Sequence, residues 1–335
     1  MTHSLKLMVC ALLLCVAASA QSLNGAGATF PNPIYQKWFT EFSASHPGVQ
    51  INYQSLGSGA GIRQVTAGTV DFGATDGPMT DEQLSQTKEK ILHIPTVLGA
   101  VVPAYNVPGV NQELKFTPDV LADIFLGKIK NWNDARIAKI NPGVHFPNQS
   151  IVVVHRSDGS GTSYVFTDYL SKVSPEWNSQ VGRNTSVKWP TGLGGKGNEG
   201  VAGTIRQIAG SIGYVELIYA VQNNIPFGTV QNKSGNFVKA SLQSTTAAAA
   251  AAAANMPADY RVSITNPDGK DAYPIASFTW LLIPQQSRDA AKGKVLHEFL
   301  EWMLKDGQGQ VAALSYAPLP KQVVSKLKTT VSTVH

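Results

Sequence analysis

The chain has 335 residues, of which 43% are hydrophobic and 15% are charged. That length is enough for a sizeable core and for more than one lobe. The formal net charge of +5 is mild and no block of Lys or Arg stands out, so we expect no nucleic-acid partner.

The first twenty residues have the pattern of a secretion signal. Lys6 precedes an apolar run, Leu7–Val16, that is too short to span a bilayer, and residues 18–20 read Ala-Ser-Ala, which matches a cleavage site. A transmembrane anchor is the less favoured alternative. We therefore predict a signal peptide at residues 1–20, a mature chain that begins at Gln21, and secretion.

Both cysteines, Cys10 and Cys15, lie inside the predicted signal. The mature chain therefore has no disulfide framework, thiol nucleophile or cysteine-ligated metal. Neither cysteine follows a small residue, since Val9 and Leu14 precede them, and this argues against a lipid anchor.

Short β-rich runs alternate with helical patterns along the mature chain, which is typical of α/β lobes with mostly parallel sheets. The predicted strands are Val49–Tyr53, Val70–Ala74, Val97–Tyr105, Ile151–His155, Ile212–Val215 and Phe278–Ile283. The predicted helices are Ile34–Ala44, Gly61–Ala67, Val120–Leu126 and, as the last strong helix, Ala290–Lys305. The alanine run Ala247–Ala254 predicts one or two helical turns in a peripheral insertion rather than a functional element.

Three segments rich in small residues stand at predicted helix starts: Ala28–Pro31, Gly57–Gly61 and Asp158–Ser163. A helix N-terminus carries unpaired N–H donors and a partial positive charge, so it attracts anions. Arg156 adds a planar guanidinium suited to oxyanions. These segments predict a pocket for a small tetrahedral oxyanion.

Alternatives without a ligand stay open for each position. Thr29 could only cap the helix that opens at Pro31, and Ser58 could only form a turn. The segment around Arg156 could be an ordinary loop, and Asp76 could cap a helix that starts near Asp81 or simply be solvated.

Asp76 follows a predicted strand, close to the predicted anion pocket. Because a carboxylate repels an anion, its presence there needs a physical reason. The reason exists if the ligand carries a proton, because hydrogen phosphate can donate that proton and fully ionised sulfate cannot. An unpaired carboxylate beside sulfate would cost several kcal/mol, so Asp76 would act as a filter.

The remaining motifs favour binding over catalysis. The glycine cluster Gly192–Gly200 is neither a Walker A loop nor a dinucleotide fingerprint, and we expect a flexible loop near the cleft or facing a partner. Ser58 and Ser160 are not in a G-x-S-x-G motif, and the seven histidines are scattered. We expect no enzyme activity, no metal and no cofactor; a phosphate-ester hydrolase using either serine is the disfavoured alternative.

Several ordered segments resemble the family of periplasmic phosphate-binding proteins of Pst-type ABC transporters. They are Gly25–Pro31, Tyr53–Gly59, Val70–Asp76, Leu126–Trp132, Arg156–Ser163 and Trp189–Gly197. The resemblance implies a two-lobed type II periplasmic binding protein fold, with the ligand cleft between lobes joined by crossing strands. It implies lobe 1 at residues 21–104 plus 277–335 and lobe 2 at residues 105–276, and it implies that the secreted protein is periplasmic.

The resemblance also implies the ligand and its contacts. Thr29, Phe30, Ser58 and Asp76 from one lobe, and Arg156, Ser160, Gly161 and Thr162 from the other, would bind one dehydrated inorganic phosphate, with Asp158 supporting Arg156. The partners would be the membrane permease subunits of a phosphate ABC transporter, and the receptor is expected to be a monomer. Sulfate, molybdate and arsenate stay open as alternative ligands; Asp76 argues against the fully deprotonated ones.

Overall fold

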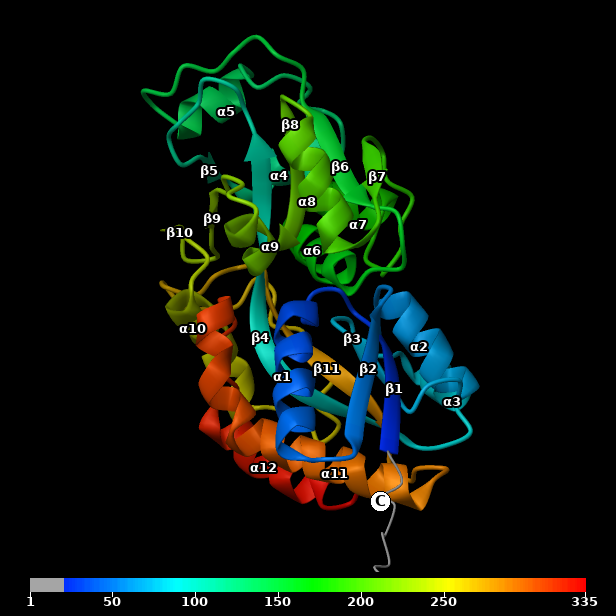
Figure 1. The fold of residues 1–335 in the computed structure, drawn as a ribbon. Helices are drawn as coiled ribbons and strands as arrows, with labels where there is room; N and C mark the ends of the chain where they lie inside the picture. Colours follow the sequence, from blue (N-terminus) through cyan, green and yellow to red (C-terminus); the bar gives the residue numbers. More distant parts are fainter. Residues whose placement is uncertain (1–20) are drawn as a thin grey trace, which may run out of the picture.

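The computed structural model describes residues 21–335 and shows two α/β bodies stacked end to end, with strand β4 (Ile91–Asn106) running through both (Figure 1). The other strands are β1 (Gln21–Gly27), β2 (Val49–Ser55), β3 (Phe72–Thr75), β5 (Lys115–Phe116), β6 (Val152–Arg156), β7 (Leu193–Gly195), β8 (Ser211–Glu216), β9 (Thr229–Gln231), β10 (Phe237–Val238) and β11 (Ala276–Pro284). The α-helices are α1 (Asn32–Ser45), α2 (Ser58–Ala67), α3 (Asp81–Ser85), α4 (Pro118–Phe125), α5 (Ala135–Ile140), α6 (Gly161–Val173), α7 (Pro175–Gln180), α8 (Gly197–Gln207), α9 (Leu217–Gln222), α10 (Leu242–Ala254), α11 (Ala290–Lys305) and α12 (Lys321–Val331), with a 3₁₀ helix, η1, at Gly307–Leu314. The predicted signal peptide lies outside the described residues.

One sheet of eight strands runs through both bodies in the order β2-β1-β3-β11-β4-β8-β6-β7, and a small sheet has the order β10-β9-β5. Strand β1 is parallel to β2 and β3, and β6 is parallel to β7 and β8. Strand β4 pairs with β11 as far as Ala100 and with β8 from Val101 onward, so it joins the two halves. The predicted two-lobed α/β class is confirmed.

Aromatic packing holds α1 on the sheet. Phe39 on α1 lies with its ring centroid 5.7 Å from that of Phe72 on β3 and 5.2 Å from that of Phe299 on α11. Phe42 also packs edge-on against Phe299. This apolar face fixes the direction of α1, so that its N-terminus stands beyond the carboxyl end of β1 (Figure 1).

All six predicted strands are present, and the helix predicted at Ala290–Lys305 has those bounds. Helix α2 starts at Ser58, three residues before the prediction. Gly61 allows helix α2 to lie directly against strands β1 and β3. A Cβ on Gly61 would lie 2.7 Å from the Cα atom of Gly27 and 2.6 Å from the carbonyl oxygen of Ala74. Glycine at this position therefore brings the helix against the sheet instead of making a loop.

In the C-terminal half one prediction is confirmed only in part, because the alanine run is helical but not wholly on the surface, and one prediction is wrong. The alanine run forms part of α10, a helix of 13 residues that starts with a capping box at Ser241 and buries Ala248, Ala249 and Ala253. It is therefore a packed element and more than a short surface insertion. Helix α11 is not the last strong helix, because α12 follows and buries Val323, Leu327 and Val331.

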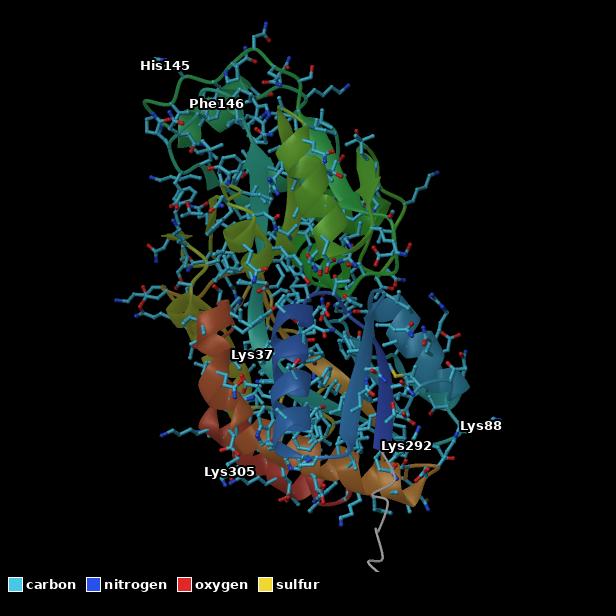
Figure 2. The ribbon with its side chains drawn as sticks, viewed as in Figure 1. Lys37, Lys88, His145, Phe146, Lys292 and Lys305 are labelled. Carbon is cyan, nitrogen blue, oxygen red and sulfur yellow. The ribbon has the colours of Figure 1, made fainter. Side chains whose placement is uncertain are left out.

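Several lysine side chains lie on the lower body, away from the junction of the two bodies. Figure 2 shows Lys37, Lys88, Lys292 and Lys305 around the lower body and His145 at the far end of the upper one, all away from the junction of the two bodies. Within residues 21–335, no helix is long and apolar enough to cross a membrane.

Candidate functional site

The candidate site lies where the carboxyl ends of strands from both bodies meet. In one body Thr29 and Phe30 follow β1, Ser58 follows β2 and Asp76 follows β3; in the other, Arg156 ends β6 and Ser160–Thr162 start α6. The predicted side chains Thr29, Phe30, Ser58, Asp76, Arg156, Ser160 and Thr162 belong to residues that are at most 3% exposed. In open α/β sheets this edge is where ligands bind.

The two halves of the predicted site touch directly. The N–H of Gly59 donates to the carbonyl oxygen of Gly159 over 2.8 Å. A Cβ on Gly161 would lie 2.4 Å from both the Asp76 Oδ2 and the Ser58 Oγ atoms. Only glycine therefore allows the start of α6 to approach Asp76 and Ser58 this closely.

Arg156 is held by a bidentate ion pair with Asp158. Its Nε and Nη2 atoms lie 2.8 and 2.5 Å from the two carboxylate oxygens, and the Arg156 side chain is 1% exposed. Although burial alone would raise the pKa of Asp158, Arg156 and the Gly197 N–H hold it below the usual range. The sequence-based pairing of Asp158 with Arg156 is thus present in the structure.

Main-chain donors gather at the same place. The N–H groups of Ser58, Gly161 and Thr162 are the first of their helices and so have no intrahelical partner. Together with the Phe30 N–H, they donate to no acceptor among residues 21–335. The Ser160 Oγ caps α6 by accepting from the Ser163 N–H at 3.0 Å, which leaves its own hydrogen for another acceptor.

Asp76 is a nearly fully buried acid among these donors. Its Oδ1 accepts from the Thr279 hydroxyl at 2.8 Å, and its main-chain N–H donates to the Ser58 Oγ at 3.2 Å. Burial raises the pKa of Asp76 from 3.8 to about 7, and the Thr279 hydrogen bond, the Arg156 charge and Ser58 oppose the rise. The group can therefore hold or share a proton near neutral pH.

Thr29 does not cap α1. The N-cap position is Pro31, without a side-chain hydrogen bond, because the Thr29 hydroxyl is engaged elsewhere. The Thr29 Oγ1 accepts from both the main-chain N–H and the side-chain amide of Asn198, at 3.2 and 2.8 Å. The Tyr219 hydroxyl donates to the Thr29 carbonyl oxygen at 2.5 Å.

Asn198 is one residue beside this site that sequence reasoning missed, and Thr279, which donates to Asp76, is another. Asn198 lies in the Gly192–Gly200 cluster, which we predicted as a flexible loop, but these residues form β7 and the start of α8. The cluster does lie at the cleft, as expected, because a fourth helix start meets the other three there. The sequence pattern that could have indicated Asn198 is the pair Gly197-Asn198, a glycine followed by a polar residue, between a short strand and a helix.

A cavity lies away from the candidate site, and the guanidinium in its wall is already paired. This cavity, of about 560 Å³, lies beside His93 and Tyr260, and the Arg261 guanidinium in its wall pairs with Asp81 and Asp259. The part of the chain that the structure describes contains no group of three or more His, Cys, Asp or Glu side chains placed to bind a metal.

Comparison with known proteins identifies the family. A family model described as a PBP superfamily domain matches residues 16–306. The chain is 47% identical over 307 residues to the phosphate-binding protein PstS of Xylella fastidiosa, which covers 91% of this chain and 84% of that protein. The chain belongs to the PstS family of phosphate-binding proteins. A second PstS protein, from Haemophilus influenzae, is 45% identical over 313 residues and covers 93% of both chains.

Solved structures with low sequence identity share the fold. A high-affinity periplasmic phosphate-binding protein named PfluDING, bound with phosphate, has a TM-score of 0.72 and 21% identity, covering 92% of this chain and 93% of its own. A phosphate-binding protein from Stenotrophomonas maltophilia has a TM-score of 0.71 and 21% identity, covering 92% and 94%. At this identity the likeness shows the type II binding-protein fold.

Proposed function

We propose that this PstS family member is a high-affinity receptor for inorganic phosphate that delivers its ligand to the permease subunits of a phosphate ABC transporter. The receptor is secreted to the periplasm, acts as a monomer and performs no chemistry on its ligand. The relatives named above are binding proteins, which supports this class over the hydrolase alternative.

The observation that carries the proposal is the buried carboxyl of Asp76 among hydrogen-bond donors. The main-chain N–H groups of Phe30, Ser58, Gly161 and Thr162 replace the water shell of an anion, and Arg156 supplies positive charge. The hydroxyls of Thr29, Ser160 and Thr162 add further donors, whereas the Ser58 hydroxyl donates to the Asp76 Oδ2 atom at 3.5 Å in this structure. Asp76 accepts the proton of hydrogen phosphate.

This arrangement selects by protonation state. Sulfate carries no proton at neutral pH, so it can pair with Asp76 only while that carboxyl itself carries the proton, and at a pH above the Asp76 pKa of about 7 it faces an unpaired carboxylate. Arsenate has the shape and protonation chemistry of phosphate, and we expect it to compete. The selectivity of the cleft for phosphate over sulfate thus depends on Asp76, the one acceptor among many hydrogen-bond donors.

Ligand entry requires the two lobes to separate, because the proposed binding residues are at most 3% exposed in the present arrangement. We propose that the lobes span residues 21–104 plus 277–335 and residues 105–276, and that they close on the anion by a hinge motion. The rims that meet on closure would then present the loaded receptor to the permease.

Calorimetric titration of the mature protein tests the proposal. The protein is unfolded and refolded to remove bound ligand, and is then titrated with phosphate and separately with sulfate. One-to-one phosphate binding without sulfate heat supports the receptor function. Absent phosphate binding, or equal binding of both anions, contradicts it.

A further inference from the structure

We propose that Asn198 is a positioning residue that makes the hydroxyls of Thr29 and Thr162 pure donors toward the bound anion. The inference rests on the proposed phosphate-receptor function. It assigns a role to a side chain that belongs to neither set of anion-binding residues predicted from the sequence.

The orientation of the Asn198 amide is fixed by the main chain. Asn198 is fully buried at the start of α8, and its Oδ1 accepts from the Glu216 main-chain N–H at 3.0 Å. Because an N–H can only donate, the oxygen of the amide must face Glu216. The Nδ2 group therefore points to Thr29 and Thr162, with distances of 2.8 and 3.1 Å to their Oγ1 atoms.

Each threonine hydroxyl accepts a second hydrogen bond. The Thr29 Oγ1 also accepts from the main-chain N–H of Asn198 at 3.2 Å. The Thr162 Oγ1 also accepts from Nη1 of Arg156 at 3.3 Å. A hydroxyl oxygen has two lone pairs and one hydrogen, so both lone pairs of both side chains are occupied.

Only the hydroxyl hydrogens of Thr29 and Thr162 remain available. Within residues 21–335, neither hydroxyl donates to a protein acceptor, although both residues are at most 3% exposed. The acceptors that these two hydrogens can meet are oxygens of the bound anion, and the unprotonated oxygens are the stronger acceptors because they carry more negative charge. Asp76, by contrast, needs an oxygen that carries a proton.

The consequence is a division of the pocket by hydrogen-bond polarity. Hydrogen phosphate binds with its protonated oxygen at Asp76 and unprotonated oxygens at Thr29 and Thr162. Thr29 follows β1 in one body, whereas Asn198 and Thr162 lie on α8 and α6 of the other (Figure 1). The amide thus orients both donors only when the bodies are together, so the donor set is completed by closure.

A double-mutant cycle measured by phosphate calorimetry tests this role. Asn198→Ala is made in the wild-type protein and in a protein that carries Thr29→Val and Thr162→Val. Loss of oriented donors to an anion should weaken phosphate binding by about 10- to 100-fold in the wild-type background. If Asn198 acts through the two hydroxyls, the same change should weaken binding by no more than about 3-fold in the valine background.

A matched control separates positioning from packing. Asn232 is another buried amide, which donates to the carbonyl oxygens of Gly269, Lys270 and Ala272 outside the site. Asn232→Ala should lower the melting temperature and leave the phosphate Kd unchanged. If Asn198→Ala does not fold, the cycle is run with Asn198→Ser, whose hydroxyl oxygen can still accept an N–H.

The outcomes are distinct. Wild-type protein that fails to bind phosphate contradicts the proposed function itself. Wild-type protein that binds phosphate, together with an Asn198 variant of unchanged affinity, overturns the positioning role alone. An equal loss in both backgrounds overturns it as well, because Asn198 would then act independently of the threonine hydroxyls.

Discussion

Replacing Asp76 with Asn removes the titratable acceptor while it keeps the shape of the side chain. Burial raises the pKa of Asp76 from 3.8 to about 7. The empty folded protein therefore holds a proton that the unfolded chain releases between about pH 4 and pH 7. A shift of about 3 pKa units corresponds to about 4 kcal/mol of stability.

The sign of this effect follows from proton linkage. The folded state binds more protons than the unfolded state in this window, so the free energy of unfolding falls as pH rises and levels off above about pH 7. Asp76→Asn should therefore stabilise the phosphate-free protein at pH 8 by up to about 4 kcal/mol, and by much less at pH 4. This gain in stability would measure how much the ionised Asp76 carboxylate destabilises the folded protein, a cost that the proposed binding role explains.

Urea unfolding of stripped wild-type and Asp76→Asn protein at pH 4, 6 and 8 measures this difference. Other groups titrate in the same range; burial, for example, lowers the pKa of His93 to about 4. They cancel in the difference between the two proteins. A difference that does not grow between pH 4 and pH 8 would refute a raised Asp76 pKa.

The same variant tests anion selectivity. An Asn at position 76 can donate to an unprotonated oxygen, so sulfate no longer meets an unpaired carboxylate. Asp76→Asn should therefore bind sulfate measurably and lose its preference for phosphate, as read by titration with both anions. Unchanged discrimination would refute the role of Asp76 as proton acceptor.

Three further substitutions, the last with a matched control, probe the site and its scaffold. Arg156→Ala should weaken phosphate binding by about 100- to 1000-fold, because it removes the cation that attracts the anion and leaves Asp158 without its guanidinium partner. A loss below tenfold in calorimetry would contradict this. Gly161→Ala places a methyl group 2.4 Å from Oδ2 of Asp76, so phosphate affinity should fall at least about tenfold; an unchanged Kd would show that the two halves need not approach so closely. On α10, Ala249→Leu overfills a fully buried position and should lower the free energy of unfolding in urea by about 1–3 kcal/mol. As the control, Ala250→Leu lies at an exposed position and should change the free energy of unfolding by about 0.5 kcal/mol or less. Equal effects would contradict the packed face of α10.

The positions of Arg156, Asp76 and the start of α6 could be predicted because each follows a β-rich run. The carboxyl ends of parallel strands meet at one edge of a sheet, so short-range signals in the sequence are enough to place these groups together. The helix at Ala290–Lys305 was predictable for a similar reason, since its apolar spacing is local.

The role of Asn198 could not be predicted, because it depends on long-range pairing. Asn198 and Thr29 are separated by 169 residues and meet only when the two bodies lie against each other. Thr29 therefore has the sequence pattern of an N-cap but does not cap α1. The buried alanines of α10 were missed because alanine has similar helix propensity on buried and exposed faces.

The central claim is that one phosphate is held between the lobes by Asp76 and the donors around it. A crystal structure of the mature protein with phosphate tests it most directly. The account predicts one anion between the bodies, with one oxygen within hydrogen-bond distance of an Asp76 carboxylate oxygen and others at Arg156 and the Thr29 and Thr162 hydroxyls. Phosphate bound elsewhere, or bound without contact to Asp76, would contradict the account.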